Sequence, residues 1–320
     1  MNKPKPLVEG ATIGVVSPAG GMPREMFDGC IDTVRTLGFE PVIAPHAWIK
    51  ETFYAAPAED RAADLVAMFS DPSIDAIWCS QGGFGAERLF PYMDFDVIKQ
   101  HPKLLIGDSN IDQLHYMIHR HATPYTLGWK NLSALATWNG SEHEWTSAVD
   151  TFKRIVMGAE VPWSYPLVDR DPAVKTLVEG RVEAPITGGC EMGFAMGTPW
   201  EPSFDGKIVV LDVSVSDTFW NKWLAQLNSA GLLKTAAGFI IIAQTAIDPI
   251  PPRLNVDTHS TERWPHLRDY LDEFITPLGK PTLLNVPMSH SRGGLPIPHG
   301  ARVELDATNK QLTLVEPFVD

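Results

Sequence analysis

A short apolar run, Leu104-Leu105-Ile106, leads through Gly107-Asp108-Ser109-Asn110 into an amphipathic segment from Ile111 to Arg120. This order predicts a strand, a tight turn and a helix. The same order recurs upstream, where strands and helices are predicted in turn at 12–16 and 24–37, 40–44 and 59–69, and 76–79 and 87–92. Strands that alternate with helices form mostly parallel sheets covered on both faces, so the pattern assigns the chain to the α/β class.

The periodicity fades between residues 158 and 185, a polar stretch punctuated by prolines, and returns after it. The later pattern predicts strands at 207–211 and 239–243, helices at 219–227 and 262–274, and a β-hairpin at 301–306 and 311–315. We therefore expect an N-terminal domain at 1–157 with a mostly parallel sheet flanked by helices, and a linker at 158–185. A smaller C-terminal α/β domain at 186–320 should end in the β-hairpin.

We expect a globular and cytoplasmic protein. Its 320 residues are 44% hydrophobic, and no apolar run approaches the roughly 20 residues of a membrane-spanning helix. Glu9 and Gly10 interrupt the N-terminus before an apolar stretch of signal-peptide length can develop. Three widely spaced cysteines predict neither a disulfide framework nor a cysteine metal site, and a formal net charge of -13 disfavours nucleic acid and anionic membranes as partners.

Ser109 lies at the turn between the predicted strand and helix. In an open parallel sheet, ligands bind at the carboxyl ends of the strands, which gives weight to residues that directly follow an apolar run. A serine on a sharp turn at the positive end of a helix has an exposed hydroxyl and a stabilised oxyanion, as a nucleophile requires. Asp112, three residues later, equally fits a capping box, so the local sequence leaves a nucleophile and a helix cap both open.

Other strand ends also carry candidate residues. Gly82-Gly83 could offer backbone N–H groups to an oxyanion, or could form only a tight turn. Asp212 and His290 each follow an apolar run, although a surface histidine is the alternative for His290. His115 and His119 share one face of a predicted helix but lack the third ligand of a zinc site.

Motifs in both halves of the chain occur in the order of one family. In the first half these are Val15 to Ala19, Asp60 to Leu65, Gly82-Gly83-Phe84-Gly85, Arg88-Leu89, Asp94-Phe95-Asp96 and Gly107-x-Ser109. In the second half they are Gly188-Gly189, Gly197-Thr198-Pro199, Gly206-Lys207-Ile208, Pro287-x-x-His290, Leu295-Pro296-Ile297 and Gly300. With these motifs the chain resembles the LD-carboxypeptidases, serine peptidases that include the microcin C self-immunity peptidases.

The resemblance implies a triad without metal or cofactor. Ser109 would be the nucleophile, His290 the base, and Asp212 the acid that orients the imidazole. The implied oxyanion-hole residues are Gly83 and Asn110, and the implied substrate-binding residues are Gly82, Phe84, Trp163 and Cys190. Because the triad draws on both domains, we expect the active site in the cleft between them.

Several positions depart from the family pattern. Asp108 and Asn110 flank the serine in place of an aromatic residue and an aspartate, Asp212 replaces a glutamate, Cys190 an asparagine, and Trp129 the proline after Gly128. The implied substrate is the murein tetrapeptide, cut with release of its terminal D-alanine. One alternative is a peptidyl-nucleotide amide of the microcin C type, with Trp163 either stacked on the nucleobase or latching the domains together. Another is a non-catalytic ligand-binding homologue, and a homodimer is expected because family members often form one.

Overall fold

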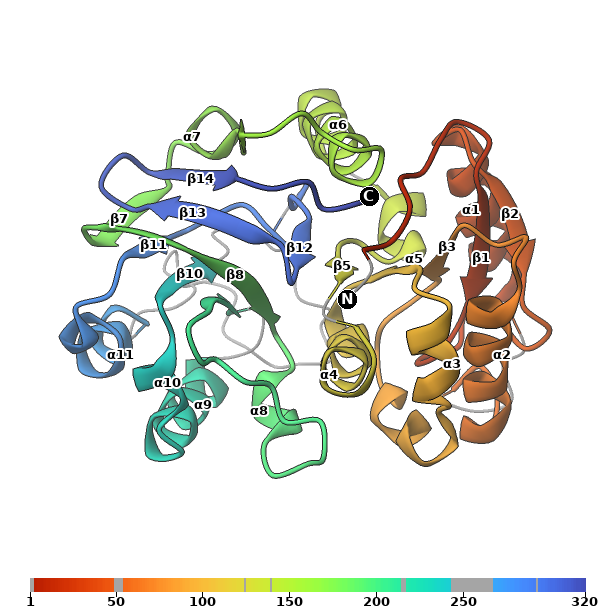
Figure 1. Cartoon of the computed structure of the whole chain (residues 1–320), viewed down its shortest axis with the longest axis horizontal. Helices are drawn as coiled ribbons and strands as arrows, with labels where there is room; N and C mark the ends of the chain where they lie inside the picture. Colours follow the sequence, from red (N-terminus) through yellow and green to blue (C-terminus); the bar gives the residue numbers. More distant parts are fainter. Residues whose placement is uncertain are drawn as a thin grey trace.

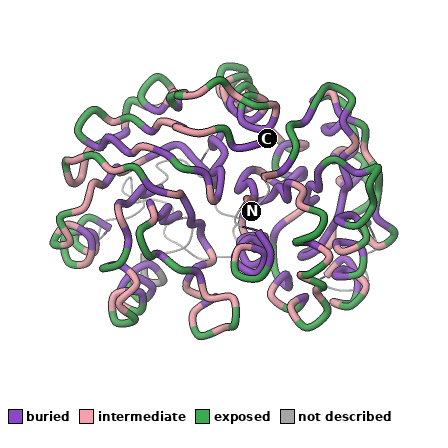
Figure 2. Tube along the Cα trace, in the orientation of Figure 1, coloured by how far each residue is buried: buried purple, intermediate pink, exposed green. Residues whose placement is uncertain are grey.

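Two β-sheets, one built mainly from each half of the chain, form the body of the protein (Figure 1). The computed structural model describes residues 3–48, 54–123, 125–138, 140–213, 217–242, 267–291 and 293–320. Strands run through the buried interior while helices and loops form most of the exposed surface (Figure 2). This arrangement confirms the predicted α/β class with one sheet in each half.

The N-terminal sheet is parallel apart from one edge strand. Its order is β12-β5-β4-β3-β1-β2. The strands are β1 (Thr12–Val16), β2 (Glu40–Ile43), β3 (Ala76–Cys79), β4 (Leu104–Gly107), β5 (Thr126–Gly128) and the antiparallel β12 (Ile297–His299). Strands β3, β4 and β5 are buried along their whole length, which explains the continuous apolar runs of β3 and β4.

Helices cover both faces of this sheet. On one side, α1 (Arg24–Thr36) packs against α5 (Leu132–Ala136). On the other, α2 (Ala58–Ser70), α3 (Phe95–Gln100) and α4 (Asp112–His121) lie side by side (Figure 1). The predicted helix at 87–92 is instead the 3₁₀ helix η1 (Ala86–Tyr92), which contains Pro91, a residue without a backbone N–H to donate. A further helix, α6 (Glu142–Val156), begins at a capping box formed by Ser141 and Glu144.

The C-terminal sheet is mixed, with order β6-β14-β13-β8-β9-β10-β11-β7. Its strands are β6 (Trp163–Ser164), β7 (Lys175–Val178), β8 (Arg181–Gly189), β9 (Ile208–Asp212), β10 (Gly238–Ile242), β11 (Thr282–Leu284), β13 (Arg302–Asp306) and β14 (Gln311–Leu314). Strands β8 to β11 are parallel, and β13 and β14 form the predicted terminal hairpin. Its helices are α7 (Leu167–Arg170), α8 (Met192–Ala195), α9 (Asp217–Ser229), α10 (Leu232–Thr235), α11 (Leu267–Phe274) and η4 (Thr276–Leu278).

The segment expected to be a linker contributes to this second sheet. It contains β6, α7, β7 and the first part of β8, so the prolines at 162, 166 and 172 separate short elements. None of these three prolines lies inside a strand, where its missing N–H would interrupt the hydrogen-bond ladder. Of the other predicted elements, residues 243 and 262–266 lie outside the described residues.

Non-covalent contacts join the two halves in addition to the continuous backbone. Strand β12, from the C-terminal half, pairs with β5 of the N-terminal sheet, with Ile297 opposite Gly128. The termini also meet, since the N–H of Asp320 donates to the carbonyl oxygen of Pro4 at 3.0 Å (Figure 1). One apolar core therefore extends across both halves. None of the described helices has the length and apolarity needed to cross a bilayer.

Candidate active site

Ser109 lies directly after β4 in a strained backbone conformation. Its φ is 64°, a left-handed value that is costly for a residue with a Cβ. It begins the 3₁₀ turn η2 (Ser109–Ile111), and no side-chain cap hydrogen bond forms at the start of η2 or of α4. The turn therefore holds the half-buried Ser109 in an unfavourable conformation without using its hydroxyl as a cap.

A glycine loop after β3 packs directly on this serine. A Cβ added to Gly82 would lie 2.8 Å from Ser109 Cβ and 3.2 Å from its Oγ, so only glycine fits there. The loop is held from the other side, because the N–H of Gly20 donates to the carbonyl oxygen of Gly82 at 2.9 Å. Gly83 follows with a φ of 99° and is exposed. Gly82 thus allows the loop to pack closely against Ser109, and Gly83 allows the left-handed backbone conformation that follows.

Asp212 and His290 form a hydrogen-bonded pair in the C-terminal half. Asp212 is the last residue of β9 and is fully buried, while the His290 side chain is 24% exposed. His290 Nδ1 donates to Asp212 Oδ2 at 2.7 Å, and the His290 backbone N–H approaches the same oxygen at 3.4 Å. The aspartate, shorter than glutamate by one methylene, therefore reaches the ring. No hydrogen bond joins Ser109 Oγ to His290 in the described part of the chain.

The charges of this pair shift both pKa values. Burial disfavours the imidazolium of His290, but the charge of Asp212 and its hydrogen bond outweigh burial and raise the pKa to about 9. For Asp212, burial acts to raise the pKa, yet the charge and hydrogen bonding of His290 hold it below its ordinary value. Asp108 also raises the pKa of His290, which means that His290 lies within electrostatic reach of the serine turn.

Residues 285–291 and 293–296, here called the histidine loop, are anchored to both halves of the chain. Trp129 Nε1 donates to the carbonyl oxygen of Gly294 at 2.9 Å, and Arg170 Nη2 donates to that of Gly293 at 2.9 Å. Within the loop, Leu295 N–H donates to the carbonyl oxygen of Pro287. Trp129, which departs from the family's usual proline, thus fixes the position of the loop that carries His290.

The two halves also meet through acidic residues near Ser109. Asp112, on α4, accepts a 2.8 Å hydrogen bond from the N–H of Cys190, which follows β8. The side-chain amide of Asn110 donates to Glu87 at 3.2 Å and to Glu191 at 3.3 Å. Burial raises the pKa of the Cys190 thiol far above its usual range, and the surrounding carboxylates raise it further. The structure thus brings Cys190 and Asn110 to the same region as Ser109.

Several polar residues of this region were not predicted from the sequence. Asn131 donates from Nδ2 to the carboxylate of Asp108 at 2.6 Å and from its backbone N–H at 3.1 Å. Lys130 lies beside it, and Glu191 follows Cys190. All of these residues come after the carboxyl ends of parallel strands. The rule that selected Ser109 and Asp212 could therefore have found them.

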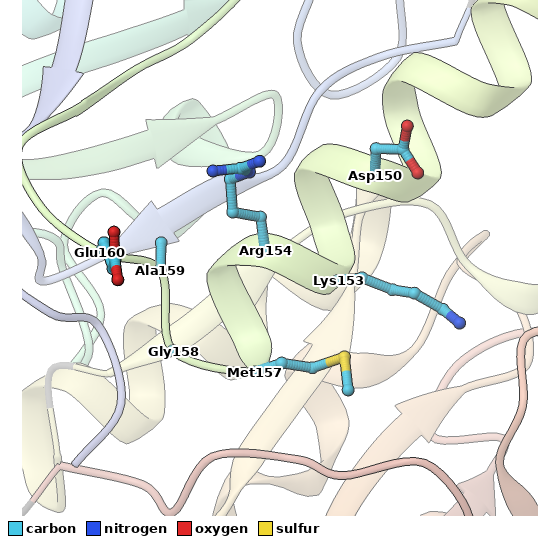
Figure 3. A pocket seen from close by; sticks show the side chains of 7 residues that line it. All are labelled: Asp150, Lys153, Arg154, Met157, Gly158, Ala159 and Glu160. Carbon is cyan, nitrogen blue, oxygen red and sulfur yellow. The ribbon is translucent and has the colours of Figure 1, made fainter.

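Trp163 is not brought to this region. It lies on β6, four strands from β9, a separation of roughly 19 Å at the usual strand spacing. It packs on Tyr165 and lines a surface cavity of about 330 Å³ together with Arg154. A neighbouring cavity of about 440 Å³ lies along α6, where Lys153 and Arg154 project in different directions (Figure 3). Phe84, another predicted contact, is 64% exposed on the glycine loop.

The histidines on α4 have structural partners. His115 Nε2 is hydrogen-bonded to the carbonyl oxygen of Gly107 at 3.0 Å, and His119 Nε2 to the hydroxyl of Thr126 at 2.8 Å. Burial lowers the pKa of both imidazoles, to about 4 for His115. Among the described residues, no group of three or more His, Cys, Asp or Glu side chains could hold a metal ion.

The fold and the site are those of an enzyme in which β4 of one sheet and β9 of the other lead into a shared polar region that contains Ser109, Asp212 and His290. A model described as the LD-carboxypeptidase N-terminal domain matches residues 13–128, and one described as the LD-carboxypeptidase C-terminal domain matches 183–305. The chain belongs to the LD-carboxypeptidase family and is an enzyme of the carboxypeptidase type.

Two curated relatives match almost the whole chain. A putative carboxypeptidase of Streptomyces coelicolor is 28% identical over 98% of this chain and 96% of its own. A probable murein peptide carboxypeptidase of Bacillus subtilis is 27% identical over 96% and 92%.

Solved structures share the fold. The microcin C7 self-immunity protein MccF aligns over 100% of both chains with a TM-score of 0.83 at 18% identity. A muramoyltetrapeptide carboxypeptidase from Oxalobacter formigenes aligns over 96% of this chain and 99% of its own, with a TM-score of 0.77 and 18% identity.

Proposed function

We propose that the chain is a serine carboxypeptidase that hydrolyses the last amide bond of a murein tetrapeptide and releases the terminal D-alanine. Ser109 is the nucleophile, His290 the general base and then acid, and Asp212 the residue that orients the imidazole. The reaction is acyl transfer to Ser109 followed by hydrolysis of the ester.

The observation that carries this proposal is the backbone of Ser109. A left-handed serine costs roughly 1–3 kcal/mol and persists where surrounding structure enforces it, typically at functional sites. The glycine that packs on Ser109 and the fixed turn before α4 supply that enforcement. A simple helix cap would need neither feature.

The chemistry follows from the charges of the site. His290 Nε2 accepts the Ser109 proton as Oγ bonds to the carbonyl carbon, and the N–H groups of Gly83 and Asn110 bind the resulting oxyanion. His290 then donates this proton to the leaving amine as the C–N bond breaks. Water attacks the ester with His290 again as base, and Ser109 Oγ regains the proton. Because His290 has a raised pKa, it must first lose a proton to begin the cycle.

A murein peptide is favoured over a peptidyl nucleotide for two reasons. The Bacillus subtilis relative is named as a murein peptide carboxypeptidase. Stacking of Trp163 on a base would favour the nucleotide alternative, but Trp163 lies four strands from β9. The substrate is therefore a small peptide that ends in a free D-alanine.

Release of D-alanine from purified murein tetrapeptide tests the proposal. Ser109→Ala should lower kcat by at least about 10⁴-fold, because the nucleophile is lost while binding remains. Ser109→Gly should be equally inactive but more stable than Ser109→Ala by about 1 kcal/mol, since glycine relieves the left-handed strain. Near-native turnover by Ser109→Ala would reject the nucleophile. No turnover by the wild type, with no labelling of Ser109 by a fluorophosphonate, would instead indicate a binding protein.

A further inference from the structure

Lys130 is fixed beside the serine turn by the pairing of two strands. Strands β4 and β5 are parallel, with Gly107 opposite Gly128, so Ser109 and Lys130 each lie two residues beyond a matched pair. The residues on both sides of Lys130 are hydrogen-bonded to the turn. Trp129 N–H donates to the carbonyl oxygen of Gly107 at 3.0 Å, and Asn131 N–H donates to the carboxylate of Asp108 at 3.1 Å. The Lys130 backbone therefore cannot move independently of Ser109.

The Lys130 side chain has no hydrogen-bond or ion-pair partner of its own among the described residues. It is half-buried, and within the described part of the chain its ammonium makes no hydrogen bond or ion pair. Two other partly buried lysines do find partners: Lys103 Nζ donates to the carbonyl oxygens of Met68 and Asp71, and Lys280 Nζ to that of Lys234 at 2.6 Å. A cation held near a reactive site without such bonds is available to a ligand.

The charge of Lys130 reaches both halves of the site. Burial lowers the pKa of Lys130, while Asp108 and Asp212 act to raise it. The charge of Lys130 in turn lowers the pKa of His290. The ammonium thus lies within electrostatic reach of the serine turn on one side and of the Asp212–His290 pair on the other.

A carboxypeptidase must place an anion in this acidic region. The scissile amide and the terminal carboxylate belong to the same last residue, so the carboxylate lies within about 4 Å of the bond that is cut. Asp108, Asp112, Asp212 and Glu191 surround the site, and the chain carries a formal charge of -13. Without a cation, these carboxylates would repel the end of the substrate.

We propose that the ammonium of Lys130 binds the free terminal carboxylate of the peptide substrate and so makes the enzyme select the last amide bond. The inference rests on the proposed function and adds the residue that recognises the chain end. Nothing in the reaction requires Lys130 to exchange a proton. Its role is to bind and orient the anion.

The test compares a murein tetrapeptide ending in D-alanine with the same peptide ending in D-alaninamide. Wild type should prefer the acid, and Lys130→Met should lower kcat/KM on the acid by about 10- to 100-fold while changing the amide little. Lys130→Arg, which keeps the charge, should retain much of the preference for the acid. Lys207→Met is the matched control, since Lys207 is also half-buried but lies at the opposite end of β9 from Asp212. An unchanged ratio of acid to amide in Lys130→Met would overturn the proposal.

Binding measurements separate this inference from the proposed function. In the Ser109→Ala background, calorimetry should show tighter binding of the acid than of the amide, and the added Lys130→Met should remove the difference. If wild type hydrolyses neither peptide but this pattern holds, the proposed function fails and the carboxylate site stands. If wild type hydrolyses the acid and its preference does not depend on Lys130, the function stands and the carboxylate site fails. Equal binding of the two peptides, or none, also overturns the site.

Discussion

Replacing Asp212 by asparagine should move the pH dependence of the enzyme in a defined direction. In the structure, burial acts to lower the pKa of His290 and Asp212 raises it to about 9. Wild-type kcat/KM should therefore fall about tenfold per pH unit below about 9. Asp212→Asn removes the charge, so the midpoint should drop to 6.5, the ordinary histidine value, or below it.

The same pair should stabilise the fold over a matching pH range. Because the folded-state pKa of His290 is raised, its contribution is fully present below pH 6.5 and is lost as the pH rises through about 9. This contribution to the free energy of unfolding is about 3 kcal/mol, from 1.36 kcal/mol for each pKa unit between the ordinary value of 6.5 and the raised value of about 9. Thermal unfolding of wild type should show this loss between pH 6.5 and 9, and Asp212→Asn should not.

D-alanine release from pH 5 to 10, at constant ionic strength, measures the midpoint. Asp64→Asn is the matched control, because Asp64 also accepts a hydrogen bond from a histidine, His46 Nδ1, at 2.9 Å in a different part of the structure. It should leave the midpoint unchanged. A wild-type midpoint near 6.5, or one that Asp212→Asn does not lower, would refute the assigned coupling.

Two other substitutions test how the site is held. Gly82→Ala should lower kcat by at least about 100-fold with little loss of stability, because the new Cβ would displace Ser109. The control is Gly29→Ala, which should be stable and active because its added Cβ meets only ordinary contacts. A fully active Gly82→Ala would contradict the proposed packing of Gly82 on Ser109. Trp129→Phe should cost about 1–3 kcal/mol in unfolding free energy and reduce kcat more than it raises KM, because the Gly294 carbonyl loses its donor and the histidine loop loosens. Unchanged kcat in Trp129→Phe would show that the anchor does not position the loop.

Much of the first sheet could be predicted because its signals are local. Strand β1 and strand β3 were predicted at their observed bounds, and α1 to within one residue. Their apolar runs and helical periodicity depend only on neighbouring residues. The short edge strands β6 and β7 were not predicted, since two to four residues between prolines carry no periodicity that separates a strand from a loop.

Part of the candidate site could be selected from the sequence for the same reason. Ser109, Asp212 and His290 follow strands or apolar runs that the sequence marks, and the structure joins Asp212 to His290. Lys130 was missed although it also follows the end of a strand, because the three-residue strand β5 before it has little apolar pattern of its own. Trp163 was selected for its aromatic ring, and only the strand order shows how far it lies from Asp212.

The sequence by itself determined the alternation of strands and helices and the place of Ser109 at a strand end, since these depend on the few residues around each position. Only the tertiary structure decided that β12 completes the first sheet and that Gly82 packs on the serine. It alone decided that Asp212 raises the pKa of His290 and that Lys130 stays unpaired in the described structure. These properties depend on burial and charge between residues far apart in the chain, and no local pattern encodes them.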